Sequence, residues 1–366
     1  MNLLNRTLHA IAIAGAVAAL LLSSCTSTPH AIGPALRASL VAESTIEHGR
    51  TFRNTVVGGI SGIDRAVDGT WYLISDDRSA KGPARFYTAT LDAATARFTL
   101  TYVATMKDRD GREFARGTVD PEAIRWDEAS GTLWWTSEGD ERAMIDPFIR
   151  EMNLNGSFVR EIPLPAPLRM DTATPSGPRD NGVFEPLALS ADGRTIIVGL
   201  EEGLKQDNGG VTRGATGAVR ISFFDRATGK LERQIAYAPE HAPQPASDSL
   251  VAGNGVVEIL PIDERRLLVL ERAYTPGLGN TVRLYAADVA AATDVSSLAS
   301  LAGTTWTPAP KQLVADFSTL GLTRLDNVEA MAWGPTLEDG RRSLVFMSDN
   351  NFNPAQVTQV IVLAVE

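Results

Sequence analysis

The chain has 366 residues, with 44 acidic and 34 basic side chains and a formal net charge of −10 when histidines are neutral. An acidic chain is a poor binder of polyanions through its overall field, so nucleic acid is excluded as an expected partner. The single cysteine excludes an intramolecular disulfide.

The first 24 residues have the pattern of a bacterial lipoprotein signal peptide. Arg6 supplies a short positive region, and residues 10–22 form an apolar run of 13 residues. This run is too short to span a bilayer, which needs about 20 apolar residues. The following Leu22-Ser23-Ser24-Cys25 resembles the lipobox, at which bacterial lipoproteins are cleaved and acylated on the cysteine.

We therefore expect an exported protein of the cell envelope, periplasmic or at the outer membrane, held to the membrane by a lipid on Cys25. An ordinary signal peptide with an incidental cysteine is the alternative. Residues 25–35 contain Thr, Ser and Pro and are expected to be a tether. Residues 36–366 show no linker or change in composition, which indicates one domain.

A hairpin module recurs five times within residues 36–366. Each copy starts with a hydroxyl or acidic residue, continues as an apolar strand, turns through a short polar segment, and ends a second apolar strand on an acidic residue. Asp-Gly between alternating apolar runs, as at Asp68-Gly69 and Asp192-Gly193, is a strong hairpin signal. The copies span residues 61–77, 122–138, 185–202, 258–271 and 329–349.

Further strands are expected after the hairpins, for example over residues 148–154 and 158–164. Four antiparallel strands make one blade, so the sequence predicts an all-β fold, a β-propeller with five blades. The fifth unit has only one further strand, 358–365, and we expect residues 36–47 to pair with it and close the ring. A six-bladed ring stays open, because residues 284–325 have room for extra strands.

The hairpins predict where acidic side chains gather. The first residue of strand one and the last residue of strand two lie at the same end of a sheet. If these hairpins are the inner ones, their ends surround one mouth of the axial channel, where the long loops also attach. The pairs are Ser61 with Asp76, Glu122 with Glu138, Glu185 with Glu201, Glu258 with Glu271, and Glu329 with Asp349.

A ring of carboxylates favours a bound cation, because desolvated like charges repel unless something neutralises them. Oxygen-only ligands suit Ca²⁺. Histidines are few, and G-x-S-x-G is absent, so a zinc site or a Ser-His-Asp triad is poorly supported. For one carboxylate alone, bonding to backbone donors or an arginine is the simpler interpretation. The candidate metal ligands are Asp76, Glu122, Glu138, Glu185, Glu201, Glu258, Glu271, Glu329 and Asp349.

An ordered series of short fragments runs from about residue 57 to residue 352. They are Gly58-Gly59-Ile60-Ser61-Gly62-Ile63, Ser75-Asp76-Asp77 with Ala84-Arg85-Phe86-Tyr87, Pro121-Glu122-Ala123-Ile124, Ser137-Glu138-Gly139, Phe184-Glu185-Pro186-Leu187, Leu270-Glu271-Arg272, Leu325-Asp326-Asn327-Val328-Glu329 and Ser348-Asp349-Asn350-Asn351-Phe352. The ordered series resembles the phytase-like family described as "esterase-like activity of phytase".

The resemblance implies hydrolysis of a phosphorylated small molecule, by distant similarity to calcium-dependent propeller phytases. Carboxylates would hold Ca²⁺, which neutralises the phosphomonoester and activates a water. Glu122 and Glu185 would be the catalytic carboxylates, and Arg85 and Arg272 would clamp the phosphate. Further candidate clamps are Arg142 and Lys205, for which pairing with a nearby carboxylate is an equally good interpretation.

The chain departs from a strong phytase in lacking a dense set of Asp, Lys and His. A second hypothesis is therefore a non-catalytic propeller that binds a ligand or a protein partner at the cell envelope. Tryptophans could line such a binding surface, but their strand positions favour packing within the blades. They are Trp71, Trp126, Trp134, Trp135 and Trp333.

Overall fold

The computed structural model describes residues 35–207, 217–243 and 253–366. They lie in one compact unit, Ile32–Glu366. The predicted signal peptide, Cys25 and nearly all of the tether lie outside the described residues. Within the described part of the chain, no helix is long and apolar enough to cross a membrane.

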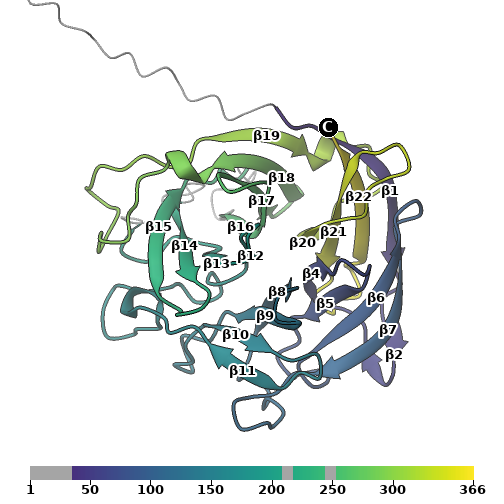
Figure 1. Ribbon diagram of the computed structural model, residues 1–366, viewed down its shortest axis with the longest axis horizontal. Coiled ribbons are helices and arrows are strands. Elements are labelled where there is room, and N and C mark those ends of the chain that lie inside the picture. Colours follow the sequence, from purple (N-terminus) through teal and green to yellow (C-terminus); the bar gives the residue numbers. More distant parts are fainter. Residues whose placement is uncertain (1–34, 208–216, 244–252) are drawn as a thin grey trace, which may run out of the picture. The chain divides into compact units, whose positions relative to one another are not determined.

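Five sheets of four antiparallel strands lie around a common axis in this unit (Figure 1). The first four blades follow chain order from the axis outwards. They are β4 (Ile60–Arg65), β5 (Trp71–Ser75), β6 (Arg85–Asp92) and β7 (Arg97–Thr105); β8 (Pro121–Asp127), β9 (Thr132–Ser137), β10 (Phe148–Met152) and β11 (Phe158–Glu161); β12 (Leu187–Leu189), β13 (Thr195–Gly199), β14 (Val219–Asp225) and β15 (Leu231–Tyr237); β16 (Gly253–Pro261), β17 (Arg266–Thr275), β18 (Gly279–Asp288) and β19 (Lys311–Asp316).

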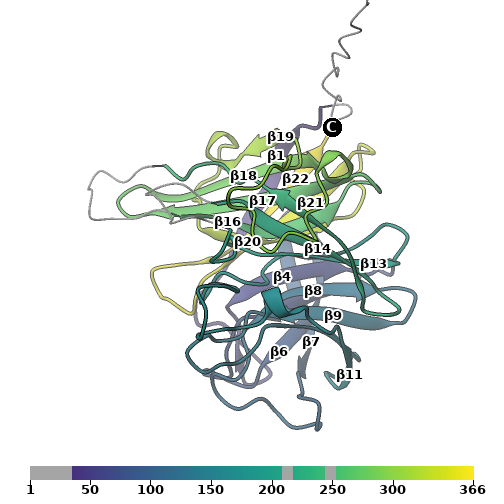
Figure 2. The ribbon, with the colours of Figure 1, turned by 90° about the vertical axis from the view of Figure 1, so that its left-hand side faces the viewer.

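The fifth blade joins the two ends of the described chain. Its innermost strands are β20 (Asn327–Trp333) and β21 (Arg342–Asp349), followed by β22 (Thr358–Val365) and, at the outer edge, β1 (Ala38–Ile46). β1 and β22 lie side by side in both views (Figures 1 and 2) and pair antiparallel from Ala38 opposite Val365 to Ile46 opposite Thr358. The predicted closure is confirmed, and it covers an edge that would otherwise expose unpaired backbone groups.

The innermost strands β4, β8, β12, β16 and β20 contact one another in a closed cycle. The prediction of a five-bladed propeller whose repeated hairpins lie innermost is therefore confirmed. Residues 284–325 complete the fourth blade with β18 and β19, and otherwise contain the short 3₁₀ turns η2 (Val289–Ala291) and η3 (Phe317–Thr319). They form no sixth blade, so that alternative is wrong. The remaining elements are the hairpin β2 (Thr51–Phe52) with β3 (Thr55–Val56), and η1 (Ala166–Leu168).

Tryptophans pack inside and between the blades. Trp71 meets Phe98 edge to face at 5.2 Å between ring centroids, and Trp135 meets Phe148 at 4.8 Å. Trp126 stacks on Tyr72 of the neighbouring blade. Buried aromatic side chains contribute large apolar areas, so these rings stabilise the blades rather than line a binding surface.

Candidate functional site

A cavity of about 770 Å³ opens where all five blades contribute side chains. Its lining is strongly acidic, with eight carboxylates against three arginines, Arg78, Arg272 and Arg324. Neutral polar side chains such as Tyr274 and Asn280 complete part of the wall. The lining carboxylates are Asp76, Asp120, Glu122, Glu138, Glu185, Asp326, Glu329 and Asp349.

Two groups of three carboxylates share Glu138. Asp120, Glu122 and Glu138 each offer one oxygen, and these oxygens lie within 4.8 Å of one another. Oxygens of Glu138, Glu185 and Glu201 do the same. Six of the nine predicted ligands thus line the cavity, namely Asp76, Glu122, Glu138, Glu185, Glu329 and Asp349, while Glu201 joins them through the second group.

Two glycines allow carboxylates to approach the neighbouring backbone. Gly59 has a φ of +62°, and a Cβ on it would lie 2.0 Å from Oδ1 of Asp76. A Cβ on Gly255 would lie 2.5 Å from Cγ of Glu201. Any other residue would displace these carboxylates, so both glycines are part of how the site is built.

Burial and mutual repulsion disfavour the charged forms of these carboxylates. Burial, strengthened by the charge of Glu329, raises the pKa of Asp76 to about 8. Burial also raises the pKa of Asp120 and of Glu201 to about 7, although Arg78 and Arg272 respectively oppose the shift. The same desolvation, with neighbouring carboxylates, raises the pKa well above its ordinary value for Glu122, Glu138, Glu185 and Asp349.

Arg272 is the internal counter-charge of the cluster. Its Nη2 lies 2.6 Å from Oε1 of Glu329 and 3.4 Å from Oε1 of Glu201. Burial lowers the pKa of Arg272, but these two carboxylates more than offset that effect and leave the pKa above its ordinary value. Nε of Arg272 is buried without a hydrogen-bond partner among the described residues.

Two carboxylate oxygens in the cavity wall are also without a partner. Oδ1 of Asp76 and Oε2 of Glu185 are buried, and no described residue donates a hydrogen bond to either. An uncompensated buried carboxylate is costly, so each must take up a proton or meet a cation. The cavity wall therefore contains buried carboxylate oxygens that no described donor or cation neutralises.

The expectation that Glu258 and Glu271 join the acidic mouth is wrong for this cavity, because neither residue lines it. Glu258 is fully buried and lies 2.5 Å from Nη2 of Arg125. Glu271 accepts hydrogen bonds from Tyr237 Oη at 2.6 Å and Lys311 Nζ at 2.7 Å.

The register of the fourth blade explains both placements. β16 begins at Gly253 and β17 continues to Thr275, so neither glutamate stands at a strand end. In the bulged inner hairpin of the fourth blade Gly255 stands opposite Arg272, whereas in the fifth blade the corresponding pair is Asn327 with Asp349, so Arg272 and not Glu271 has the position of Asp349. Successive side chains of a strand point to opposite faces, so Arg272 rather than its neighbour Glu271 lies in the cavity wall.

Of the predicted phosphate clamps, only Arg272 lines the cavity. Arg85 is buried, and its guanidinium is occupied by Asp77 at 2.7 Å and by the carbonyl oxygen of Val56 at 2.8 Å. Arg142 is exposed and lies 3.5 Å from Asp180. Lys205 pairs with Glu141.

Sequence analysis missed four charged lining residues, Asp120, Asp326, Arg78 and Arg324. Arg78 lies 3.4 Å from Asp120, and Arg324 lies 2.9 Å from Asp326. Asp120 and Asp326 stand two and three positions before the predicted Glu122 and Glu329. The acid pairs Asp-x-Glu and Asp-x-x-Glu were the signal that could have found them.

A family model described as "Phytase-like: Esterase-like activity of phytase" matches residues 55–352. No curated protein matches this sequence.

Similar solved structures include the periplasmic gluconolactonase of Pseudomonas aeruginosa, with 13% identity over 84% of this chain and 87% of that chain and a TM-score of 0.38. A GH43 β-1,3-galactosidase with galactodeoxynojirimycin has 14% identity over 88% and 95%, with a TM-score of 0.47. An endo-1,4-β-xylanase of Bacteroides thetaiotaomicron has 10% identity over 83% and 90%, with a TM-score of 0.47.

Proposed function

Since the chain belongs to the phytase-like family, we propose that it is a Ca²⁺-dependent hydrolase of phosphomonoesters that acts in the acidic cavity. The observation that carries the proposal is the pair of carboxylate groups that share Glu138, each with its oxygens within 4.8 Å. Clustered carboxylates of this kind are the donor set of a hard cation.

The residues present fit such a cation. All candidate donors are oxygens, and Ca²⁺ takes six to eight oxygen ligands in flexible geometries. Three arginines cannot neutralise eight lining carboxylates, and Oδ1 of Asp76 and Oε2 of Glu185 have no donor. The ligands would come from Asp120, Glu122, Glu138, Glu185 and Glu201.

Bound Ca²⁺ would supply positive charge to a phosphomonoester and lower the pKa of a water. The chain's own residues would bind and orient the substrate. Arg272 has an unpartnered Nε with which to donate to a phosphate oxygen, and Arg78 and Arg324 add two more guanidinium groups to the cavity wall. Glu122 and Glu185 would hold the attacking water and accept its proton at a carboxylate oxygen.

The test uses purified protein that lacks residues 1–25, with p-nitrophenyl phosphate and phytate as substrates. We expect turnover that needs Ca²⁺ and stops when a chelator is added. E185Q should lower kcat/KM by about 10²-fold or more, because it removes a proton acceptor. E338Q, which changes an exposed glutamate outside the cavity, is the matched control and should retain the wild-type rate.

Absence of turnover on a broad panel of phosphomonoesters would reject the hydrolase. Calcium binding without turnover would instead support the second hypothesis, a non-catalytic propeller that binds its ligand at the acidic cavity.

A further inference from the structure

The guanidinium of Arg125 lies on the axis of the ring. Arg125 belongs to β8 and is fully buried. It donates hydrogen bonds to one backbone carbonyl from each of the five innermost strands, so all five strands meet at this one side chain. The acceptors are Ile63 at 2.5 Å, Leu187 at 2.6 Å, Ile124 at 2.9 Å, Ile259 at 3.3 Å and Met331 at 3.4 Å.

Glu258 of β16 completes this axial group. Its Oε2 lies 2.5 Å from Nη2 of Arg125, and its Oε1 accepts from the backbone N–H groups of Ile259 at 2.9 Å and Leu187 at 3.3 Å. Both peptide groups of Leu187 are therefore held by the same ion pair, its N–H by Glu258 and its carbonyl by Arg125.

Leu187 matters because it begins β12, the shortest innermost strand, with only three residues. Glu185, whose carboxylate lines the cavity, stands two residues earlier, and the intervening Pro186 has no N–H to donate. On the outer side, the carbonyl of Pro186 accepts from Gly199 of β13 at 3.1 Å. On the axial side, the Arg125–Glu258 pair holds Leu187, the first residue after Glu185 that has both backbone groups.

We propose that the Arg125–Glu258 pair positions Glu185, so that its carboxylate lies with those of Glu138 and Glu201 in the proposed cation site. This inference rests on the proposed calcium function. Removal of two charges from water is costly, so a buried ion pair is not by itself a source of stability. Its hydrogen bonds to Leu187 instead determine where the carboxylate of the preceding Glu185 stands, as outer-shell partners do around metal ligands.

The experiment compares R125K, which keeps the charge and loses the planar fork, with E258Q, which keeps the shape and loses the charge. Calcium binding is measured by calorimetric titration of the folded protein, and the melting temperature is measured in parallel. We expect both variants to raise the calcium Kd by about 10-fold or more, the usual effect of losing an outer-shell partner. A long-range charge effect would weaken binding in E258Q and leave R125K unchanged.

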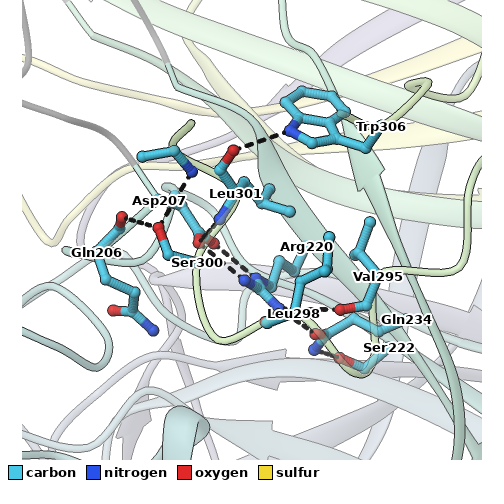
Figure 3. Close-up of polar contacts among 12 residues, drawn as sticks. Gln206, Asp207, Arg220, Ser222, Gln234, Val295, Leu298, Ser300, Leu301 and Trp306 are labelled. Carbon is cyan, nitrogen blue, oxygen red and sulfur yellow. Dashed lines mark hydrogen bonds and ion pairs between the residues drawn. The ribbon is translucent and has the colours of Figure 1, made fainter. Parts of the chain in front are cut away.

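R220K is the matched control. Arg220 is equally buried and forms a bidentate pair with Asp207, with Nε–Oδ2 and Nη2–Oδ1 distances of 2.6 and 2.8 Å (Figure 3). It also donates to Gln234 at 2.8 Å and to the carbonyl of Leu298 at 3.0 Å, so it ties a long loop to the third blade. None of these residues lines the cavity. R220K should lower the melting temperature and leave the calcium Kd unchanged.

A calcium Kd in R125K equal to that of the wild type and of R220K would overturn the positioning role. If one of the two axial variants does not fold, the other decides; if neither folds, the pair serves the ring itself and the positioning role is rejected. If the wild type binds no calcium, the proposed function is rejected, and this inference is rejected with it.

Discussion

Burial of like charges dominates the chemistry of individual residues in the cavity. Asp76 and Asp120 have pKa values raised to about 8 and about 7, mainly by burial. Arg272 sits between Glu201 and Glu329, Arg78 lies beside Asp120, and Arg324 lies beside Asp326. Within the described part of the chain the other lining carboxylates have no ion pair, namely Asp76, Glu122, Glu138, Glu185 and Asp349. The site is therefore poised between taking up protons and taking up a metal ion.

The double variant E122Q/E185Q nearly preserves the shape of both side chains and removes two carboxylates from the proposed calcium site. If Ca²⁺ binds the folded chain and not the unfolded chain, as proposed, it stabilises the fold by about 2.7 kcal/mol at a hundredfold excess over Kd. We expect the wild type to melt at a higher temperature with calcium and the double variant to lose that rise. Differential scanning calorimetry measures both.

E232Q/E338Q is the control for that variant, because it removes two exposed carboxylates that do not line the cavity. It should keep the calcium-induced rise. An equal rise in E122Q/E185Q would show that calcium acts elsewhere.

The second prediction concerns pH. Asp76, Asp120 and Glu201 have folded-state pKa values raised above the ordinary values of 3.8 and 4.5. Between about pH 4 and pH 8 the folded state thus binds more protons than the unfolded state, and this contribution to stability is lost as pH rises through 7 to 8. The chelator-treated protein should melt at lower temperature at pH 8 than at pH 5.5.

Calcium requires deprotonated ligands, so its stabilising effect should grow over the same pH range. Melting curves at four pH values, each with chelator and with calcium, measure both trends. A metal-free melting temperature that rises from pH 5.5 to pH 8 would contradict the raised pKa values.

Some strands follow directly from turn and alternation signals in the sequence, whereas others differ in length and register from what those signals predict. Hairpins such as β4–β5 and β8–β9 follow from Asp-Gly or Ser-Gly turns between apolar runs. β16 and β17 extend beyond their predicted ends, so the position that Asp349 has in the fifth blade belongs to Arg272 in the fourth, one residue later than predicted. That change exchanges a predicted ligand, Glu271, for a cation, Arg272.

Removal of β1 is expected to destabilise the ring. A protein that starts at Thr51 lacks β1, which leaves the edge of β22 without its partner. An exposed, apolar edge strand invites pairing between molecules, so we expect a lower melting temperature and aggregation. Calorimetry and size-exclusion chromatography measure these, with a protein that starts at residue 36 as the control. Equal melting of the two proteins would show that the closure contributes nothing to stability.

At the scale of the whole molecule, the ring concentrates charge that is spread over the sequence. Eight acidic residues from separate segments meet in one cavity, while one arginine on the axis binds all five innermost strands. The cavity is thus a property of closure, because its lining residues come from all five blades.

The lipid anchor on Cys25 is a prediction from the sequence. C25S should move the protein from the membrane fraction to the soluble fraction, because it removes the acylated atom and leaves the propeller unchanged. Fractionation with immunoblotting measures the location, and circular dichroism of the purified protein shows whether the fold persists. Retention of C25S in the membrane fraction would reject the lipoprotein interpretation.

Local sequence pattern was enough to predict the all-β class, the five hairpins, the closing strand and most of the carboxylates that line the cavity. These follow from short-range causes, since alternation sets strand faces and turn chemistry sets strand ends. The tertiary structure was needed to show that Glu258 lies on the axis with Arg125, that Arg272 rather than Glu271 lies in the cavity wall, and that Arg85 forms an ion pair with Asp77. A shift of one residue along a strand moves a side chain to the opposite face, and convergence on an axis depends on all five blades at once, so neither can be read from local pattern.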